Sequence, residues 1–384
     1  SNPIRKSLRG LSYIEGQNQV STRGQASGDR FANINAADRH FYHRYADRSP
    51  ETTLSEPSGR PEREWTSSQI SAATDFNLKA HSISMLARIR SFLIEGRFMS
   101  AGPFDGKARV DLSPEDVVNR SFIEGVAYFQ GNKEQGYPDG MIGQGTFALL
   151  KEYGFEYTLE GGEHTPGRGI VSRNAPPEKI YDYFRDMILD QGGIFSTIPE
   201  HVNLVGIRGG KLEDDSIKHV ENTFNKWNDT LVVLSVNADG KKEVQLYEGT
   251  TDPGVARKGV ATLPEGTHSM SYGWHNASSS YRALNPAHEG QVPVFRDGNS
   301  YLGQGSGSGS WLNMHTTHGY DQGALAGPGG YSLGCAVING QDQYESFISK
   351  MAQANGKGQE IIYYTLVSAS RLDSLEIKHQ SPHR

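Results

Sequence analysis

The chain has almost no cysteine, no long apolar segment and no excess of positive charge. A single cysteine in 384 residues excludes an internal disulfide, so cysteine usage does not indicate an oxidising compartment. No apolar run approaches the length that spans a bilayer, which predicts no membrane span. The net charge of -6 predicts no nucleic-acid partner, because such proteins carry basic patches. The first residues carry no hydrophobic stretch, so no signal peptide is visible.

Glycine, in contrast, is abundant, with 45 residues, which favours a loop-rich β protein over a helical bundle. Residues 1–75 are polar and poor in aliphatic side chains, so we expect an extended arm whose partner is a carrier or delivery apparatus. The rest of the chain predicts an α+β multidomain protein. Its expected parts are a small helical domain at 76–155, a connector with one helix at 156–199, a mostly β domain at 200–372 and a polar tail at 373–384.

Apolar residues at helical spacing predict a helix from Ile83 to Ile94. Ser113 and Asp116 have the spacing of a capping box around a proline, so a second helix is expected to start there and to bury an apolar face as far as Phe129. Further helices are expected from Thr146 to Leu150 and over residues 175–192.

Beyond residue 200, short β-branched or aromatic segments alternate with turn residues, which is typical of strands. The expected strands are 202–207, 230–236, 243–247, 266–271, 292–295, 311–314 and 361–367. Residues 237–240 predict a hairpin turn, and residues 343–354 predict the long helix of this domain. The glycine- and serine-rich run 303–309 predicts a surface loop, because no helix follows it as a nucleotide-binding loop requires.

The strongest chemical signal is Cys335 in the turn Ser332-Leu333-Gly334-Cys335. A thiolate is the reactive form of cysteine, and a nearby imidazole lowers the thiol pKa and accepts its proton. Free cysteines are more often buried small hydrophobes. Gly334 argues against that interpretation here, because glycine permits a backbone conformation in which successive amides point at one oxyanion.

His315 is the predicted base for this thiol. If the segment around it is a strand, Met314 faces the core and His315 faces a cleft. The Thr316 carbonyl is expected to orient the imidazole, and the amides of Gly334 and Cys335 are expected to form the oxyanion hole.

Other histidines were weighed against His315. His318 is an alternative base, but only twelve residues separate its following glycine from Ser332. His315 and His318 together also suggest zinc, yet positions three apart on a strand face opposite ways and no carboxylate lies at ligand spacing, so no metal is predicted. His268 and Tyr272 are expected to line the cleft or to serve as structural polar residues.

The run from His315 to Cys335 resembles the signature of L,D-transpeptidase catalytic domains, in which a His-Gly or His-Ser pair is followed, after a spacer of similar length, by Ser/Thr-His-Gly-Cys. The resemblance spans roughly residues 200–370. It implies that Cys335 is the nucleophile, His315 the base and Thr316 the third member, and that Ser332 and Gly334 belong to the catalytic turn. Leu333 replaces the usual histidine, and Val337 replaces a frequent arginine that would contact a substrate carboxylate.

By this resemblance, the substrates are peptidoglycan stem peptides. The thiolate attacks the carbonyl of an L-to-D linkage and releases D-alanine, and an amine or water resolves the thioester without a cofactor. His268, Tyr272, His318 and Leu333 are the expected substrate-binding residues.

Residues 76–155 resemble the three-helix peptidoglycan-binding domain, through Val126–Gln130, Asp139–Gly143 and Ala148–Leu150. Action in the periplasm or cell wall is therefore expected, as an exported effector or phage-type lytic factor. Two alternatives stay open. One is a catalytically weak wall-binding protein, which Leu333 favours, and the other is a zinc-dependent wall peptidase.

Overall fold

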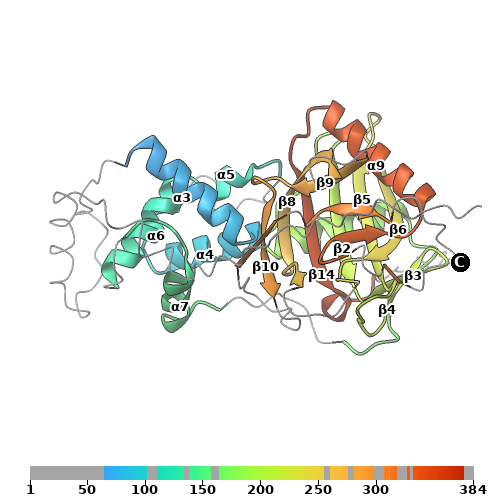
Figure 1. Cartoon of the computed structure of the whole chain (residues 1–384), viewed down its shortest axis with the longest axis horizontal. Helices are drawn as coiled ribbons and strands as arrows, with labels where there is room; N and C mark the ends of the chain where they lie inside the picture. The colour runs from blue at the N-terminus through green and yellow to red at the C-terminus, as the bar shows by residue number, and fades with distance from the viewer. Residues whose placement is uncertain are drawn as a thin grey trace, which may run out of the picture. The chain divides into compact units, whose positions relative to one another are not determined.

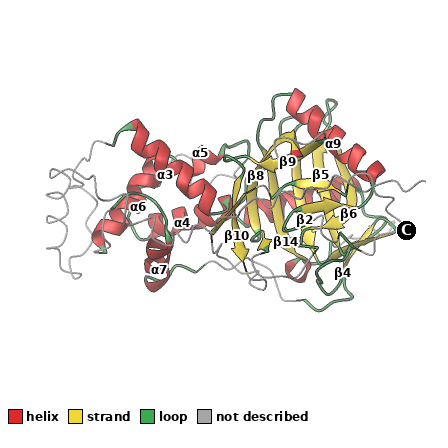
Figure 2. Ribbon diagram, in the orientation of Figure 1, coloured by secondary structure: helices red, strands yellow, loops and turns green. Residues whose placement is uncertain are grey.

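The computed structural model describes residues 65–101, 110–133, 138–156, 164–254, 260–275, 281–296, 307–310, 312–317, 327–328 and 332–375. Within these ranges the chain combines seven α-helices with a closed barrel of eight strands (Figure 1, Figure 2). The expected mixture of helix and strand is confirmed. Among the described helices, none has the length and apolarity needed to cross a bilayer.

Along the chain, all the described α-helices but the last precede the barrel strands. They are α3 (Ser67–Ala80), α4 (Ile83–Glu95), α5 (Pro114–Val117), α6 (Arg120–Asn132), α7 (Gln144–Glu152), α8 (Pro177–Asp190) and α9 (Gln341–Gly356), with a short 3-10 turn η5 (Ala369–Arg371).

Helix α3 begins inside the segment that the sequence predicts to be an extended arm up to residue 75, so that boundary is wrong. Thr66 and Gln69 form a capping box at its start, each side chain bonding the other residue's backbone amide. Ala73 and Leu78 are buried on its inner side. Burial of this narrow apolar stripe against the neighbouring helices stabilises α3, although most of the segment is polar.

The second predicted helix is divided in two. The capping box of Ser113 and Asp116 is present, but α5 ends at Val117. Asn119 then caps α6, because its Oδ1 accepts the Phe122 amide at 3.1 Å. An asparagine side chain favours such a cap over a helix interior, and this explains the break.

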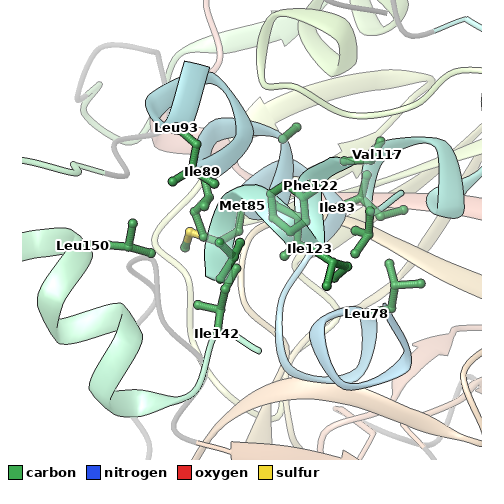
Figure 3. Packing of buried hydrophobic residues seen from close by; sticks show 14 of the residues in the cluster. Leu78, Ile83, Met85, Ile89, Leu93, Val117, Phe122, Ile123, Ile142 and Leu150 are labelled. Carbon is green, nitrogen blue, oxygen red and sulfur yellow. The ribbon is translucent and has the colours of Figure 1, made fainter. Parts of the chain in front are cut away.

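A hydrophobic core holds α3, α4, α6 and α7 together (Figure 3). Ile89 and Phe122 are fully buried in it. The turn that precedes α7 is fixed by two side chains from other helices. Gln130 accepts the Gly140 amide at 3.0 Å, and Asn77 donates to the Gly140 carbonyl at 3.0 Å.

This helical group also contacts the barrel. The Thr267 amide donates to Ser84 Oγ at 3.0 Å, and the Tyr363 hydroxyl donates to the Leu112 carbonyl at 2.6 Å. Tyr363 is part of the same buried cluster as the helices.

The strands form one barrel and two small sheets. The barrel order is β12 (Met314–Thr316), β13 (Ala336–Ile338), β6 (Lys242–Thr250), β5 (Asp229–Val236), β2 (Val202–Arg208), β14 (Ile362–Ser368), β8 (Gly266–Trp274) and β9 (Arg282–Pro286). The small sheets are β1 (Gly169–Val171), β4 (Ser216–His219) and β3 (Gly210–Glu213), and β11 (Gly307–Ser310), β10 (Gln291–Arg296) and β7 (Ala261–Thr262).

Most predicted strands are present, and the hairpin turn between β5 and β6 is held by Asn237, whose Oδ1 accepts the Lys241 amide at 2.9 Å. The strand predicted at 311–314 is displaced, since β12 begins only at Met314.

Both faces of the barrel wall are covered, which explains why its central strands are apolar throughout. Leu204 and Leu231 belong to the core that includes α9. Val205 and Val232 belong to a second core on the opposite face, which includes Phe184 of α8.

Candidate functional site

Two short parallel strands bring the predicted base next to the cysteine turn. In the pairing of β12 with β13, His315 lies opposite Val337. The Ala336 amide donates to the Asn313 carbonyl at 3.1 Å, so the pairing extends to the residue beside Cys335. Cys335 therefore lies immediately before β13, and His315 lies on the adjacent strand β12.

Met314 and His315 point to opposite faces of β12. Met314 belongs to the barrel core, as expected, and side chains alternate along a strand, so His315 points to the other face. Cys335 lies in the neighbourhood of the same tyrosine as His315: the Tyr281 hydroxyl is 3.5 Å from His315 Nδ1, and the Cys335 charge acts on the Tyr281 phenol.

The His315 ring is oriented by the Thr316 carbonyl, as the sequence predicts, but it is buried rather than exposed to a cleft. Its Nδ1 lies 2.8 Å from the Thr316 carbonyl oxygen, and the residue is 3 % exposed. A carbonyl only accepts, so Nδ1 carries the proton in this contact. In the neutral ring, Nε2 then has the lone pair that a general base needs.

Two aromatic residues for which the sequence predicts no catalytic role, His275 and Tyr281, complete this cluster. The Tyr281 hydroxyl lies 3.5 Å from His315 Nδ1, and the His275 ring is tilted against His315 with centroids 4.6 Å apart. His275 and Tyr281 are themselves stacked at 4.7 Å. Burial raises the pKa of Tyr281 to about 12, and the Cys335 charge adds to the shift, so this phenol lies near both predicted catalytic side chains.

The only sequence signal for this pair was its position at the two ends of a serine-rich stretch. The His275 amide donates to the Tyr281 carbonyl at 3.1 Å, so the two residues close the connection between β8 and β9. Their contact with His315 depends on the pairing of β12 with β9, which sequence patterns do not reveal.

The thiol itself differs from the expectation. Cys335 is partly exposed as a residue. Burial of its sulfur nevertheless raises the pKa of the thiol to about 11, and a hydrogen bond with the Asn313 backbone opposes this shift only in part. A lowered pKa was predicted from the neighbouring imidazole. In this structure burial of the sulfur raises the thiol pKa instead, and the opposing effect comes from the Asn313 backbone rather than from His315. The resting thiol is therefore protonated at neutral pH.

Ser332 and Gly334 shape the turn in front of Cys335. Gly334 has a φ of +131°, a conformation that favours glycine, and a Cβ there would overlap the Ala261 carbonyl oxygen. Ser332 is fully buried, and its hydroxyl lies 2.7 Å from the Cys335 carbonyl. The Gly334 amide donates to Ser332 Oγ at 3.3 Å. This contact contradicts the prediction that the Gly334 amide faces an oxyanion.

His268 and Tyr272 lie on β8 and are not joined to the cluster around His315 by the contacts described above. His268 is 2 % exposed, and its Nε2 donates to the Pro264 carbonyl at 2.8 Å. Burial lowers the pKa of His268 to about 4, with the Pro264 hydrogen bond opposing and Arg208 adding to the shift. This is a neutral structural histidine. Tyr272 packs on the barrel core, with the Arg282 guanidinium 5.3 Å from its ring.

Leu333 extends from the turn into solvent and is 44 % exposed, with its carbonyl accepting the Ala261 amide at 3.4 Å. His318 lies outside the described residues. The recess behind Gly334 is lined by core residues that include Met314 and Met270. It thus lies on the opposite face of β12 from His315, not in the cleft that the sequence predicts.

No group of three or more metal-ligating side chains with suitable geometry is found in the ranges that the structure describes. Comparisons with protein-family models, with curated proteins and with solved structures found no match.

Proposed function

We propose that the chain is a peptidoglycan-modifying cysteine enzyme that acts on L,D linkages of stem peptides through a thioester. One observation carries this proposal. A histidine whose Nδ1 donates to the next residue's carbonyl at 2.8 Å lies on β12, and Cys335 immediately precedes β13, the strand that pairs with it. A thiol with an oriented imidazole on the adjacent strand supports a nucleophile and general-base pair.

The reaction begins with proton transfer from the Cys335 thiol to His315 Nε2 as the sulfur attacks the carbonyl carbon of the linkage. A C–S bond forms, and the tetrahedral intermediate then breaks its C–N bond. The imidazolium returns the proton to the leaving D-alanine amine. An incoming amine or water attacks the thioester carbon and gives its proton to the imidazole. The C–S bond then breaks, and the imidazolium returns the proton to the sulfur, which restores the thiol.

The raised thiol pKa means that the proton moves during attack, because little thiolate exists beforehand at neutral pH. The Thr316 carbonyl supports this step, because it accepts a hydrogen bond from Nδ1 and thereby stabilises the positive charge that develops on the imidazolium. The Tyr281 phenol, with its raised pKa, stays neutral.

The helical segment 76–155 is proposed as the wall-binding part. Its support is the resemblance at Asp139–Gly143, together with a turn that Gln130 and Asn77 hold in one conformation. A preformed turn reduces the entropy that is lost on binding.

The test is incubation of the full chain with purified tetrapeptide-stem muropeptides, followed by mass spectrometry. The wild type is expected to remove D-alanine or to form a cross-link, and Cys335→Ala is expected to do neither. His315→Gln is the second variant, and it is expected to lower the rate by about 100-fold, which is typical for loss of a general base. Equal activity of wild type and Cys335→Ala would reject the proposal.

A second candidate is a catalytically weak wall-binding protein, and two observations favour it. The polar residue usual beside the nucleophile is replaced by the exposed Leu333, and burial raises the thiol pKa. In that case the wild type and Cys335→Ala would sediment equally with peptidoglycan sacculi, and neither would change the muropeptide masses.

A further inference from the structure

A buried ion pair lies at the end of the barrel that carries the cysteine turn. Arg208 Nε and Asp252 Oδ1 are 3.0 Å apart, and the two side chains are 1 % and 0 % exposed. Arg208 also donates to the Leu263 carbonyl at 3.1 Å, and Asn222 donates to Asp252 Oδ2 at 2.6 Å. Buried charges are tolerated only when paired and hydrogen bonded, so this pair fixes the backbone around Asp252.

The segment preceding Asp252 is fixed by a second carboxylate. Asp229 Oδ2 accepts the Thr251 amide at 2.6 Å and the Thr251 hydroxyl at 2.8 Å. Burial raises the pKa of Asp229, and the charge of Asp252 adds to the shift. Two buried acids that repel each other are costly to hold, even with one of them paired to Arg208, so the arrangement points to a functional constraint.

The segment around Asp252 also contacts Ser332, the first residue of the cysteine turn. Ser332 Oγ lies 3.1 Å from the Asp252 carbonyl, and the Gly254 amide donates to the Ser332 carbonyl at 2.8 Å. The same hydroxyl lies 2.7 Å from the Cys335 carbonyl. A chain of contacts thus runs from the Arg208–Asp252 pair through Ser332 to the backbone of Cys335.

We propose that Ser332, Asp252 and Arg208 are positioning residues for Cys335: the buried ion pair fixes the Asp252 carbonyl, and this carbonyl and the Cys335 carbonyl hold the Ser332 hydroxyl that closes the turn. The inference deepens the proposed function and rests on it for its catalytic consequence. Neither Asp252 nor Arg208 touches the reacting atoms.

The test uses the fact that Cys335 is the only cysteine, so iodoacetamide alkylation reports on this thiol alone. Ser332→Ala removes the hydroxyl and leaves every buried charge paired. A looser turn lets water reach the sulfur, so alkylation at pH 8 is expected to become faster by 3-fold or more. The upper limit is about 100-fold, which corresponds to full relaxation of the thiol pKa from about 11 to its ordinary 9. The rate on muropeptides is expected to fall by about 10-fold, because orientation is lost.

Asp252→Asn tests the ion pair, and Glu265→Gln is its matched control. Glu265 is 2 % exposed, pairs with Arg371 at 3.3 Å and also feels the Arg208 charge, so its neutralisation removes a buried acid from the same electrostatic neighbourhood but leaves Asp252 in place. Unlike Asp252, it does not contact Ser332 in the structure described above. Asp252→Asn is expected to speed alkylation, whereas Glu265→Gln is expected to stay within about 2-fold of the wild type at equal loss of stability.

The proposal is overturned if Ser332→Ala has the alkylation pH profile of the wild type, or if Asp252→Asn and Glu265→Gln have the same alkylation rate at equal stability. Failure of the proposed function has a different signature. The wild type would then leave muropeptides unchanged, while Ser332→Ala would still alter the alkylation profile.

Discussion

His268 gives a sharp prediction about how stability depends on pH. Burial lowers its pKa from 6.5 to about 4. Between these two values the unfolded chain carries the proton and the folded chain does not. Folding stability therefore falls as the pH decreases from about 6.5 to 4, with no contribution from this residue above that range. The difference between these two pKa values corresponds to about 3 kcal/mol when the transition is complete.

His268→Gln isolates this contribution, because glutamine does not titrate and its amide still offers a donor to the Pro264 carbonyl. At pH 7.5 the variant loses only packing and hydrogen-bond energy. At pH 4.5 the unfolding free energy of the wild type is lower by a further amount of about 2.5 kcal/mol, the cost of keeping His268 neutral, and the variant has no such loss. The difference in unfolding free energy between the two proteins is thus expected to move by about 2.5 kcal/mol in favour of the variant.

Urea unfolding followed by circular dichroism at both pH values measures this difference. All other titrating groups are shared by the two proteins, so their effects cancel. A change below about 0.5 kcal/mol would show that His268 titrates normally and would refute the assignment of a buried neutral ring.

Three further substitutions test the turn, the helical core and a helix cap. Gly334→Ala is expected to cost about 1–3 kcal/mol of unfolding free energy, because of its φ of +131°, and to abolish turnover of muropeptides. Phe122→Ala, at a fully buried position of the helical core, is expected to cost about 3–5 kcal/mol in urea unfolding. Ser113→Ala removes half of the capping box of α5 and is expected to cost about 1 kcal/mol, whereas Ser113→Thr is expected to restore most of it.

Local patterns in the sequence predicted most helices and strands, because those elements have clear periodicity. Helices α4, α7, α8 and α9 lie close to their predicted ranges. Helix α3 was missed because its polar composition masks a narrow buried stripe. The closure of the barrel was beyond prediction, since the pairing of Met314 with Leu284 joins strands that are distant along the chain.

The candidate site was predicted to a similar extent. The Thr316 carbonyl contact of His315 is local and was expected. The raised pKa of the Cys335 thiol was not expected, because desolvation depends on what surrounds the sulfur after folding. His268 was expected either to line the cleft or to be a structural polar residue. Its burial on β8, which pairs with β14, and its hydrogen bond to the Pro264 carbonyl support the second alternative.

The same dependence on tertiary structure explains how a protonated thiol and a neutral imidazole suit one another. In the proposed reaction, proton transfer from Cys335 to His315 would create two charges in a poorly solvated place, which costs free energy in the resting protein. The Thr316 carbonyl would lower that cost on the imidazolium side, and attack on the substrate carbonyl would transfer the sulfur's negative charge to oxygen. Under this proposal the thiol becomes reactive chiefly when a substrate is bound, and the turn at Ser332 sets how much of that cost is recovered in the transition state.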